Sequence, residues 1–169
     1  HRMRTEEIET MRVLVTGGAG FIGSHVVDAY VERGHDVTVV DDLSSGLRDN
    51  VNAKAKLIVA DLRDAGTIDA LRGEKFDLVN HHAAQIDVRV SVADPAADAE
   101  LNIVATLRLF RAMIDDGVRK IVFASSGGAA YGEPLTAPQD EQHPVNPLSP
   151  YGCAKLAFDE YLGFFRKVH

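Results

Sequence analysis

The segment from Val13 to Gly23 constrains the fold of this chain more than any other, because it places glycines where a strand turns into a helix. Residues 13–15 are apolar and predict a short buried strand, and apolar residues at helical spacing follow the glycines. Gly17 permits a tight turn, Gly20 lets the backbone approach a pyrophosphate, and Gly23 lets the helix pack closely on the strand. Free backbone amides at a helix N-terminus attract phosphates, so this segment predicts dinucleotide binding.

A second apolar strand, residues 37–41, ends in Asp41. Its distance from the glycines fits a carboxylate that bonds the ribose hydroxyls of an adenosine. Further strands are predicted at 56–60, 76–80 and 120–124, and helices at about 67–71, 94–115 and 150–167. Strands that alternate with helices predict an α/β fold, a Rossmann-like doubly wound parallel sheet with helices on both faces.

The segments between these elements are expected to be loops at 81–92 and 127–150. Asp61 follows the third strand, on the rim where open parallel sheets bind ligands, and is predicted to contact the cofactor. Apolar residues at near-helical spacing are expected to form the core face of the 94–115 helix: Ala99, Ile103, Leu107, Phe110 and Ile114.

The predicted organisation is one dinucleotide-binding domain, residues 11–169, after an extension, residues 1–10, that lacks the apolar core of a signal peptide. A formal net charge of -7 argues against nucleic acid or an anionic membrane as the main partner. No apolar stretch approaches the length that spans a bilayer. The single cysteine, Cys153, excludes an internal disulfide and favours a reducing cytoplasm. The pair His81–His82 has no spaced ligand set, so no metal site is predicted.

Tyr151 and Lys155 are placed to do chemistry, because they lie four residues apart on one face at the start of the last predicted helix. An ammonium and a nicotinamide cation nearby both favour the phenolate of such a tyrosine. The phenolate can take a hydroxyl proton while hydride leaves the same carbon. Ser126, just beyond the fifth strand, is expected to bond the reacting oxygen, with its neighbour Ser125 as the alternative.

With these motifs the chain resembles the extended short-chain dehydrogenase/reductase family, in its NAD-dependent sugar epimerase/dehydratase branch. Within that branch it is most similar to the UDP-glucose 4-epimerases. The matching segments occur in the family's order over Met11 to His169, and they are Thr16 to Gly23, Asp41 to Gly46, Asp61 to Arg63, His81 to Gln85, Asn102, Ser125–Ser126 and Tyr151 to Lys155.

This resemblance implies a nucleotide-sugar 4-epimerase of the UDP-glucose/UDP-galactose type, in which NAD takes hydride from position 4 of the sugar and returns it to the other face. Tyr151 would deprotonate the hydroxyl at that position, Lys155 would hold the nicotinamide ribose, and Ser126 would align the sugar hydroxyl. The implied cofactor contacts are Gly17, Gly20, Phe21, Ile22, Gly23, Asp41, Asp42, Ser45, Gly46, Asp61, Leu62, His82, Ala83, Ala84, Gln85, Asn102, Ser125, Tyr151 and Lys155. The two neighbouring aspartates would repel a ribose 2′-phosphate, which favours NAD over NADP.

Two features of the stretch that follows the serines refine the expectation. The stretch 127–130 holds no carboxylate, whereas 4,6-dehydratases carry an Asp-Glu pair and related decarboxylases a glutamate, so both activities are disfavoured. One extra residue lies between the serines and Tyr131, which keeps Ser125 open as the catalytic hydroxyl.

The chain ends at His169, where members of the family continue with a sixth strand and a substrate domain. The resemblance therefore predicts a Rossmann domain that is incomplete at its C-terminal end, binds NAD and turns over sugar nucleotides poorly. An exposed sheet edge and an exposed helix face are expected to favour association. A cytoplasmic homodimer through the helices at 94–115 and 150–167 is the expected assembly, with a UDP-sugar as its substrate.

Two alternative functions stay open. A reductase or dehydrogenase with net hydride transfer would release or consume NADH, whereas an epimerase recycles its cofactor. A non-catalytic dinucleotide-binding or regulatory module would have no need of Tyr151 beside Lys155.

Overall fold

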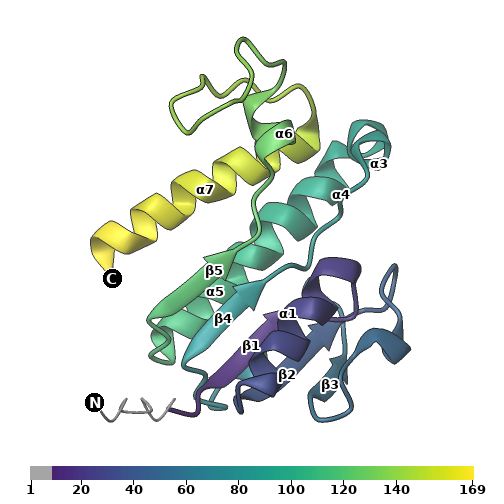
Figure 1. Cartoon of the computed structure of the whole chain (residues 1–169), viewed down its shortest axis with the longest axis vertical. Coiled ribbons are helices and arrows are strands. Elements are labelled where there is room, and N and C mark those ends of the chain that lie inside the picture. Colours follow the sequence, from purple (N-terminus) through teal and green to yellow (C-terminus); the bar gives the residue numbers. More distant parts are fainter. Residues whose placement is uncertain (1–8) are drawn as a thin grey trace, which may run out of the picture. The chain divides into compact units, whose positions relative to one another are not determined.

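The computed structural model describes residues 9–169. Residues 1–8 of the predicted extension lie outside the described residues. Five parallel strands form one sheet in the order β3-β2-β1-β4-β5 (Figure 1). The strands are β1 (Arg12–Thr16), β2 (Asp36–Asp41), β3 (Lys56–Val59), β4 (Leu78–His81) and β5 (Lys120–Phe123). Helical segments lie in every connection between consecutive strands, which agrees with the predicted α/β class.

The chain divides into two compact units. The sheet unit comprises the described part of residues 1–61 together with 73–83 and 116–123, and it holds the five strands, α1 (Phe21–Glu32) and the short 3-10 helix η1 (Arg48–Asn50). The helical unit comprises residues 62–72, 84–115 and 124–169. It contains α2 (Ala65–Leu71), α3 (Val88–Ala93), α4 (Pro95–Ala99), the π-helix η2 (Glu100–Ala105), α5 (Thr106–Asp115), α6 (Gly127–Tyr131) and α7 (Pro150–Val168).

The core of the sheet unit lies around β1, which pairs with β2 on one side and β4 on the other. Val13, Leu14 and Val15 are fully buried, as expected for a central strand of a parallel sheet. Helix α1 packs on β1 and β2 and contributes Val27 to their apolar cluster. This packing fixes the direction in which the glycine segment between β1 and α1 leaves the sheet.

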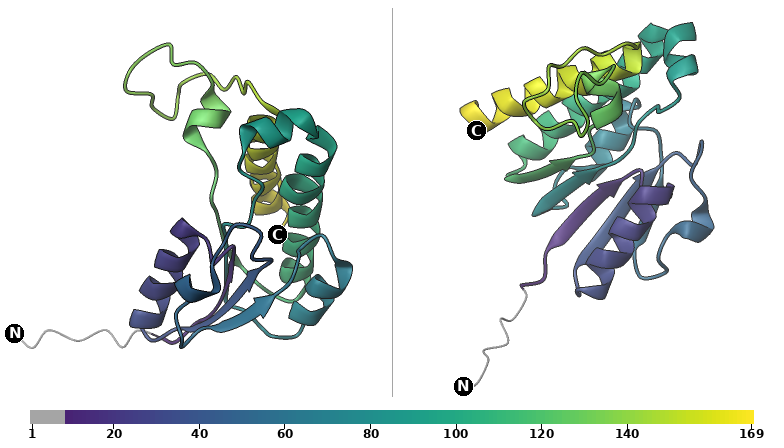
Figure 2. Two further views of the ribbon diagram at one scale, coloured as in Figure 1. Left: turned by 90° about the vertical axis from the view of Figure 1, so that its right-hand side faces the viewer. Right: turned by 45° about the horizontal axis from the view of Figure 1, so that its top comes forward.

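In the helical unit, α4, η2 and α5 follow one another as the single long helical run predicted for residues 94–115 (Figure 2). Helix α7 packs against α3, α4, η2 and α6. Phe110 of α5 and Phe158 of α7 are both fully buried, and their rings meet edge to face with centroids 5.1 Å apart. The aromatic pair ties the long run to α7.

The structure corrects three local predictions. The expected loops at 81–92 and 127–150 contain the short helices α3 and α6. The fourth strand begins at Leu78, not at residue 76. The predicted core face of the long helix is displaced at its start, because the polar residues Asp98 and Asn102 are buried there while Ala99 and Ile103 are only partly buried. A pattern of apolar residues cannot detect a face that begins with buried polar groups.

Candidate active site

In the glycine segment of the sheet unit, the backbone packs closely against other backbone atoms. Gly17 has a φ of 68°, and a Cβ atom there would lie 2.6 Å from the amide nitrogen of Ala83. A Cβ atom at Gly23 would overlap the carbonyl oxygen of Gly17. Both positions therefore require glycine for reasons of space, and at Gly17 also of backbone conformation.

The N-terminus of α1 has no side-chain cap. Gly20 occupies the N-cap position without a side-chain hydrogen bond, and the first turn holds no acidic residue. Phe21 and Ile22, both predicted to contact the cofactor, are 80% and 63% exposed. The first turn thus presents amides that no side chain caps among the described residues, which is the arrangement that binds phosphates.

Asp41 connects the end of β2 to the glycine segment. Its Oδ2 accepts a hydrogen bond of 2.9 Å from the amide of Ala19, and its Oδ1 accepts one of 2.9 Å from the amide of Leu43. Asp42 forms a turn by accepting from the amide and hydroxyl of Ser44. The buried Asp41 carboxylate is therefore held at the edge of the glycine segment that is predicted to bind the cofactor.

The loop that carries Ser45 and Gly46 lies against the same segment. A Cβ atom at Gly46 would come within 2.8 Å of Ala19, and the amide of Leu47 donates to the Ala19 carbonyl. After β3, the amide of Ala60 donates to the carbonyl of Asp41. Asp61, the next residue, therefore follows directly on this contact between the ends of β3 and β2. The structure brings these predicted residues of the sheet unit to one end of the strands.

A buried network at the end of β4 had not been predicted. The Thr16 hydroxyl accepts a hydrogen bond of 3.3 Å from the Ala83 amide and lies 2.7 Å from Nδ1 of His81. The amide of His82 donates to the Thr16 carbonyl, and the His81 ring stacks on Phe123. The network holds the His82–Ala83 backbone against Gly17. Thr16 and His81 stood in recognised motifs, but only the folded sheet places them in contact.

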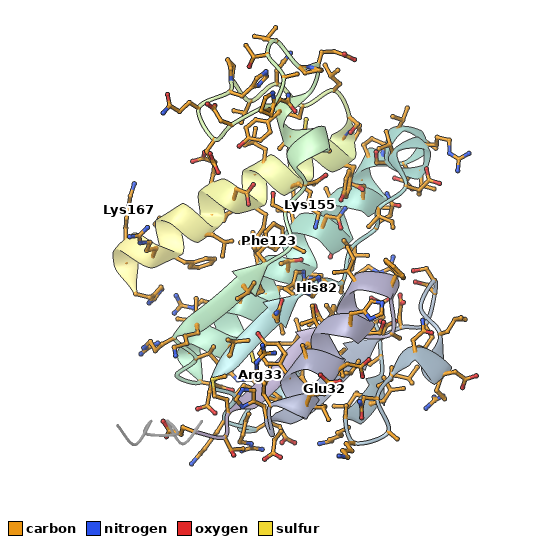
Figure 3. All side chains as sticks on the ribbon, in the orientation of Figure 1. Glu32, Arg33, His82, Phe123, Lys155 and Lys167 are labelled. Carbon is orange, nitrogen blue, oxygen red and sulfur yellow. The ribbon has the colours of Figure 1, made fainter. Side chains whose placement is uncertain are left out.

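In the helical unit, Lys155 is buried on α7 with 4% exposure (Figure 3). Its Nζ donates a hydrogen bond of 2.9 Å to the carbonyl of Ala124 and lies 5.8 Å from the centroid of the Tyr151 ring. Burial lowers the pKa of Lys155 to about 8, and the negative charges of Asp159 and Asp98 oppose that shift. The predicted Tyr151–Lys155 pair is therefore formed, on one face of α7.

The two candidate serines have different surroundings. Ser125 donates a hydrogen bond of 2.6 Å to Oδ2 of Asp159, which lies one helical turn beyond Lys155. Ser126 is at the N-cap position of α6, and its side chain forms no capping hydrogen bond. Asp159 was not predicted, although its position four residues after Lys155 on one helix was a usable signal.

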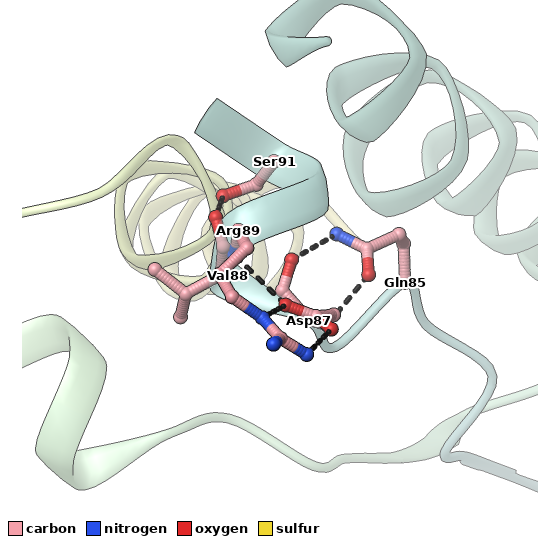
Figure 4. Close-up of polar contacts among 5 residues, drawn as sticks. All are labelled: Gln85, Asp87, Val88, Arg89 and Ser91. Atoms are coloured by element: carbon pink, nitrogen blue, oxygen red, sulfur yellow. Dashed lines mark hydrogen bonds and ion pairs between the residues drawn. The ribbon is translucent and has the colours of Figure 1, made fainter. Parts of the chain in front are cut away.

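Gln85 and Asn102 are joined by paired hydrogen bonds. The amide of Gln85 donates to Oδ1 of Asn102 at 3.0 Å, and Nδ2 of Asn102 donates to the Gln85 carbonyl at 3.0 Å. Nε2 of Gln85 also donates to the carbonyl of Asp87, whose side chain caps α3 and pairs with Arg89 (Figure 4). The Arg89 guanidinium holds the pKa of Asp87 at about 2.

No helix in the part of the chain that the structure describes is long and apolar enough to cross a membrane. No group of three or more His, Cys, Asp or Glu side chains among residues 9–169 is arranged to hold a metal ion.

The chain has a parallel sheet in the order β3-β2-β1-β4-β5, a glycine-rich connection after its first strand, and the Tyr151–Lys155 pair. These features together are typical of a class of dinucleotide-dependent enzymes. The model of the NAD dependent epimerase/dehydratase family matches residues 13–167, and the chain belongs to this family, as its motifs predicted.

Individual relatives agree with that family. The chain is 46% identical over 157 residues to a putative UDP-glucose 4-epimerase of Methanocaldococcus jannaschii, covering 93% of this chain and 52% of the relative. It is 46% identical over 164 residues to the UDP-glucose 4-epimerase of Mycolicibacterium smegmatis, covering 94% and 52%. The chain thus spans about half the length of the curated relatives it matches.

Solved structures give the same result. The Thermotoga maritima UDP-glucose 4-epimerase with UDP-glucose has a TM-score of 0.89 at 45% identity, covering 93% of this chain and 52% of that one. The Thermus thermophilus UDP-glucose 4-epimerase in complex with NAD has a TM-score of 0.88 at 47% identity, covering 94% and 51%. The predicted fold class is confirmed by this likeness.

Proposed function

We propose that this chain is the NAD-binding part of a nucleotide-sugar 4-epimerase that acts on UDP-glucose and UDP-galactose. The observation that carries the proposal is the Tyr151–Lys155 pair on α7, in a chain whose glycine segment has no room for a Cβ atom at Gly17 or Gly23. Family membership and relatives named UDP-glucose 4-epimerase support it. The NAD complex of the Thermus thermophilus relative supports the choice of cofactor.

The residues of the sheet unit fit NAD. The uncapped first turn of α1 suits the pyrophosphate, and Asp41 suits the adenosine ribose, because carboxylates accept hydrogen bonds from hydroxyls. Asp42, beside it, would add negative charge that disfavours a 2′-phosphate. The remaining proposed contacts in this unit are Gly17, Gly20, Phe21, Ile22, Gly23, Ser45, Gly46, Asp61, His82 and Ala83. Leu62, which belongs to the helical unit, is also a proposed contact. When bound, NAD supplies a reversible acceptor for hydride.

The residues of the helical unit would handle the proton and the orientation of the sugar. Tyr151 would accept the proton of the hydroxyl at position 4 and return it, acting as general base and then general acid. Lys155 would hold the nicotinamide ribose and favour the Tyr151 phenolate by its positive charge. Ser126 would bond the sugar hydroxyl. Engagement of Ser125 with Asp159 supports the choice of Ser126 over Ser125. Ala84, Gln85, Asn102 and Ser125 complete the proposed cofactor contacts.

The first test of this function is calorimetric titration of the 169-residue chain with NAD and NADP, then of the NAD mixture with UDP-glucose. We expect NAD to bind more tightly than NADP. Absence of NAD binding would contradict the proposal.

The catalytic test replaces Tyr151 with Phe in the full-length protein and measures interconversion of UDP-galactose and UDP-glucose. We expect a loss of roughly 10²–10⁴-fold in kcat, because a positioned acid-base group contributes about that much. Tyr161→Phe, on the same helix and 42% exposed, is the matched control and should keep its activity. A stoichiometric rise or fall in NADH absorbance would favour a reductase. Unchanged activity of the Tyr151→Phe variant would favour a non-catalytic binding module.

We also propose that the protein is a cytoplasmic homodimer with a single NAD-binding domain over residues 11–169. The free, exposed Cys153 supports a reducing compartment. Exposed apolar side chains on α7, among them Tyr161 and Phe164, support association through that helix. Sedimentation of the protein over a range of concentrations tests the dimer, and a concentration-independent monomer would contradict it.

A further inference from the structure

Asp98 is a buried carboxylate in α4 that none of the recognised motifs includes. Its exposure is 1%, and its Oδ1 accepts hydrogen bonds of 2.9 Å from both Nε2 of Gln85 and Nδ2 of Asn102. Burial of an ionised carboxylate is costly unless donors or cations compensate for the lost water. A group placed at such cost, next to two proposed cofactor contacts, calls for a physical reason.

The first consequence of Asp98 is the orientation of two side-chain amides. An ionised carboxylate only accepts hydrogen bonds, so each amide must turn its NH₂ group toward Asp98. For Asn102 this turns Oδ1 toward the backbone amide of Gln85, from which it accepts at 3.0 Å. Nδ2 of Asn102 then donates to both Asp98 and the Gln85 carbonyl. The carboxylate therefore reinforces the orientation that backbone groups also favour. For the Asn102 amide these are the backbone groups of Gln85, and for the Gln85 amide they are those of Asp87, which donates to Oε1 and accepts from Nε2.

The second consequence is electrostatic. Oδ2 of Asp98 is buried and has no hydrogen-bond partner among the described residues. Its negative charge acts on Lys155. Burial lowers the pKa of Lys155, and the charge of Asp98 partly opposes that shift. Asp159 and Tyr151 on its own helix and the Ala124 carbonyl also act on the Lys155 side chain. Asp98 is the charged group that α4, packed against α7, presents to this ammonium.

We propose that Asp98 is a positioning residue of the site: its carboxylate ties the Gln85 and Asn102 amides to each other in their shared orientation and supplies negative charge to the Lys155 ammonium. Its effect on the cofactor rests on the NAD-binding function proposed above. Its effect on the two amides does not, since that effect belongs to the protein without ligand.

Asp98→Asn isolates the charge. The asparagine oxygen can still accept from Gln85 and Asn102, and its NH₂ group replaces the oxygen that has no partner, so the local geometry is kept. Calorimetry of NAD binding from pH 7 to 10 then measures the pH at which affinity falls as Lys155 loses its proton. We expect that pH to be lower in Asp98→Asn than in the wild type by about half a unit or more.

Asp98→Ala removes both the charge and the acceptor. Amide hydrogen exchange, followed by NMR in the protein without ligand, reports the hydrogen bond from the Gln85 amide to Asn102. We expect exchange at Gln85 to become about tenfold faster or more, while exchange at Leu109 in the core of the helical unit keeps its wild-type rate. Asp98→Asn should leave Gln85 exchange close to that of the wild type.

Glu100→Gln is the matched control for both measurements. It removes one negative charge two residues further along the same helical run, from a side chain that is 45% exposed and pairs with Arg108. We expect neither the pH dependence of NAD binding nor the Gln85 exchange rate to change. An equal shift in the control would show a general charge effect and would overturn the electrostatic part.

The outcomes separate this inference from the proposed function. A wild-type protein that does not bind NAD contradicts the function, while the exchange comparison still tests the positioning of Gln85. A wild-type protein that binds NAD, with an unshifted Asp98→Asn profile and an unchanged Asp98→Ala exchange rate, overturns the inference. An unshifted profile with faster exchange restricts Asp98 to orienting the amides.

Discussion

At the scale of single residues, Lys155 stands out because its charge is buried and yet required by the proposed chemistry. Desolvation lowers its pKa from the ordinary 10.5 to about 8, against the charges of Asp159 and Asp98. The hydrogen bond to the Ala124 carbonyl compensates for part of the lost hydration. A lysine with this pKa is mostly protonated at neutral pH and titrates within an accessible range.

The lowered pKa of Lys155 predicts a pH dependence of stability. Below pH 8 the lysine is protonated in both folded and unfolded protein, so its buried charge destabilises the fold. Between about 8 and 10.5 the folded protein releases the proton first, and the free energy of unfolding rises with pH. We expect a gain on the order of 2–3 kcal/mol across this range in the wild type relative to Lys155→Met. Chemical denaturation of both proteins from pH 7 to 10 measures it, and parallel curves would contradict it.

The close approach of backbone atoms at Gly17 predicts that one added methyl group destabilises the fold and prevents NAD binding. In Gly17→Ala the new Cβ atom would lie 2.6 Å from the Ala83 amide nitrogen, at a φ of 68°. We expect a loss of about 2–4 kcal/mol in the free energy of unfolding, and loss of NAD binding, because backbone must move on both sides. Gly34→Ala is the control, since Gly34 has a φ of 81° but no atom within 4 Å of the added Cβ. Its cost should be about 1–2 kcal/mol, from backbone strain alone.

At the scale of elements, helix α7 depends on its first turn, which carries Tyr151. Ser149 is the N-cap residue, and its hydroxyl accepts a hydrogen bond of 3.1 Å from the amide of Gly152. Pro150 follows at the first helical position, where its missing N–H is harmless. The sequence Ser-Pro before an apolar run is a recognisable helix start, and it explains why α7 begins at the predicted residue.

Removal of this cap should weaken the element. We expect Ser149→Ala to lower the free energy of unfolding by about 1 kcal/mol, because one N-terminal amide loses its partner. Ser126→Ala is a matched comparison, since Ser126 also occupies an N-cap position but its side chain makes no capping hydrogen bond. Urea denaturation should show the loss in the first variant and little change in the second. Equal losses would mean that the hydroxyl bond of Ser149 contributes nothing.

The long helical run shows where local patterns stop being informative. Its limits follow from Asp94, which caps α4, and from the apolar spacing that continues to residue 115. The buried face at its start consists of Asp98 and Asn102, whose partner Gln85 comes from an earlier segment. The π-helix η2, which includes Asn102, lies where these polar contacts replace apolar packing.

At the scale of the whole molecule, binding of the cofactor should stabilise the fold, because NAD is expected to bind the folded chain and not the unfolded one. At about a hundredfold excess of NAD over its Kd, we expect Tm to rise by roughly 5–10 °C. NADP at the same concentration should give a smaller rise, because Asp41 and Asp42 would repel its 2′-phosphate. Differential scanning calorimetry measures both, and an equal or larger rise with NADP would contradict the cofactor assignment.

Local spacing in the sequence determined the strands, the glycine turn, the start of α7 and the Tyr151–Lys155 pair, because each depends on residues a few positions apart. The order of the strands brought Asp41 to Ala19 and Thr16 to His81, at sequence separations of 22 and 65. The contacts of Asp98 with Gln85 and of Asp159 with Ser125 were likewise decided only by the tertiary structure. A buried carboxylate looks like any surface aspartate in the sequence, since its burial and its partners depend on distant segments that only the folded chain brings together.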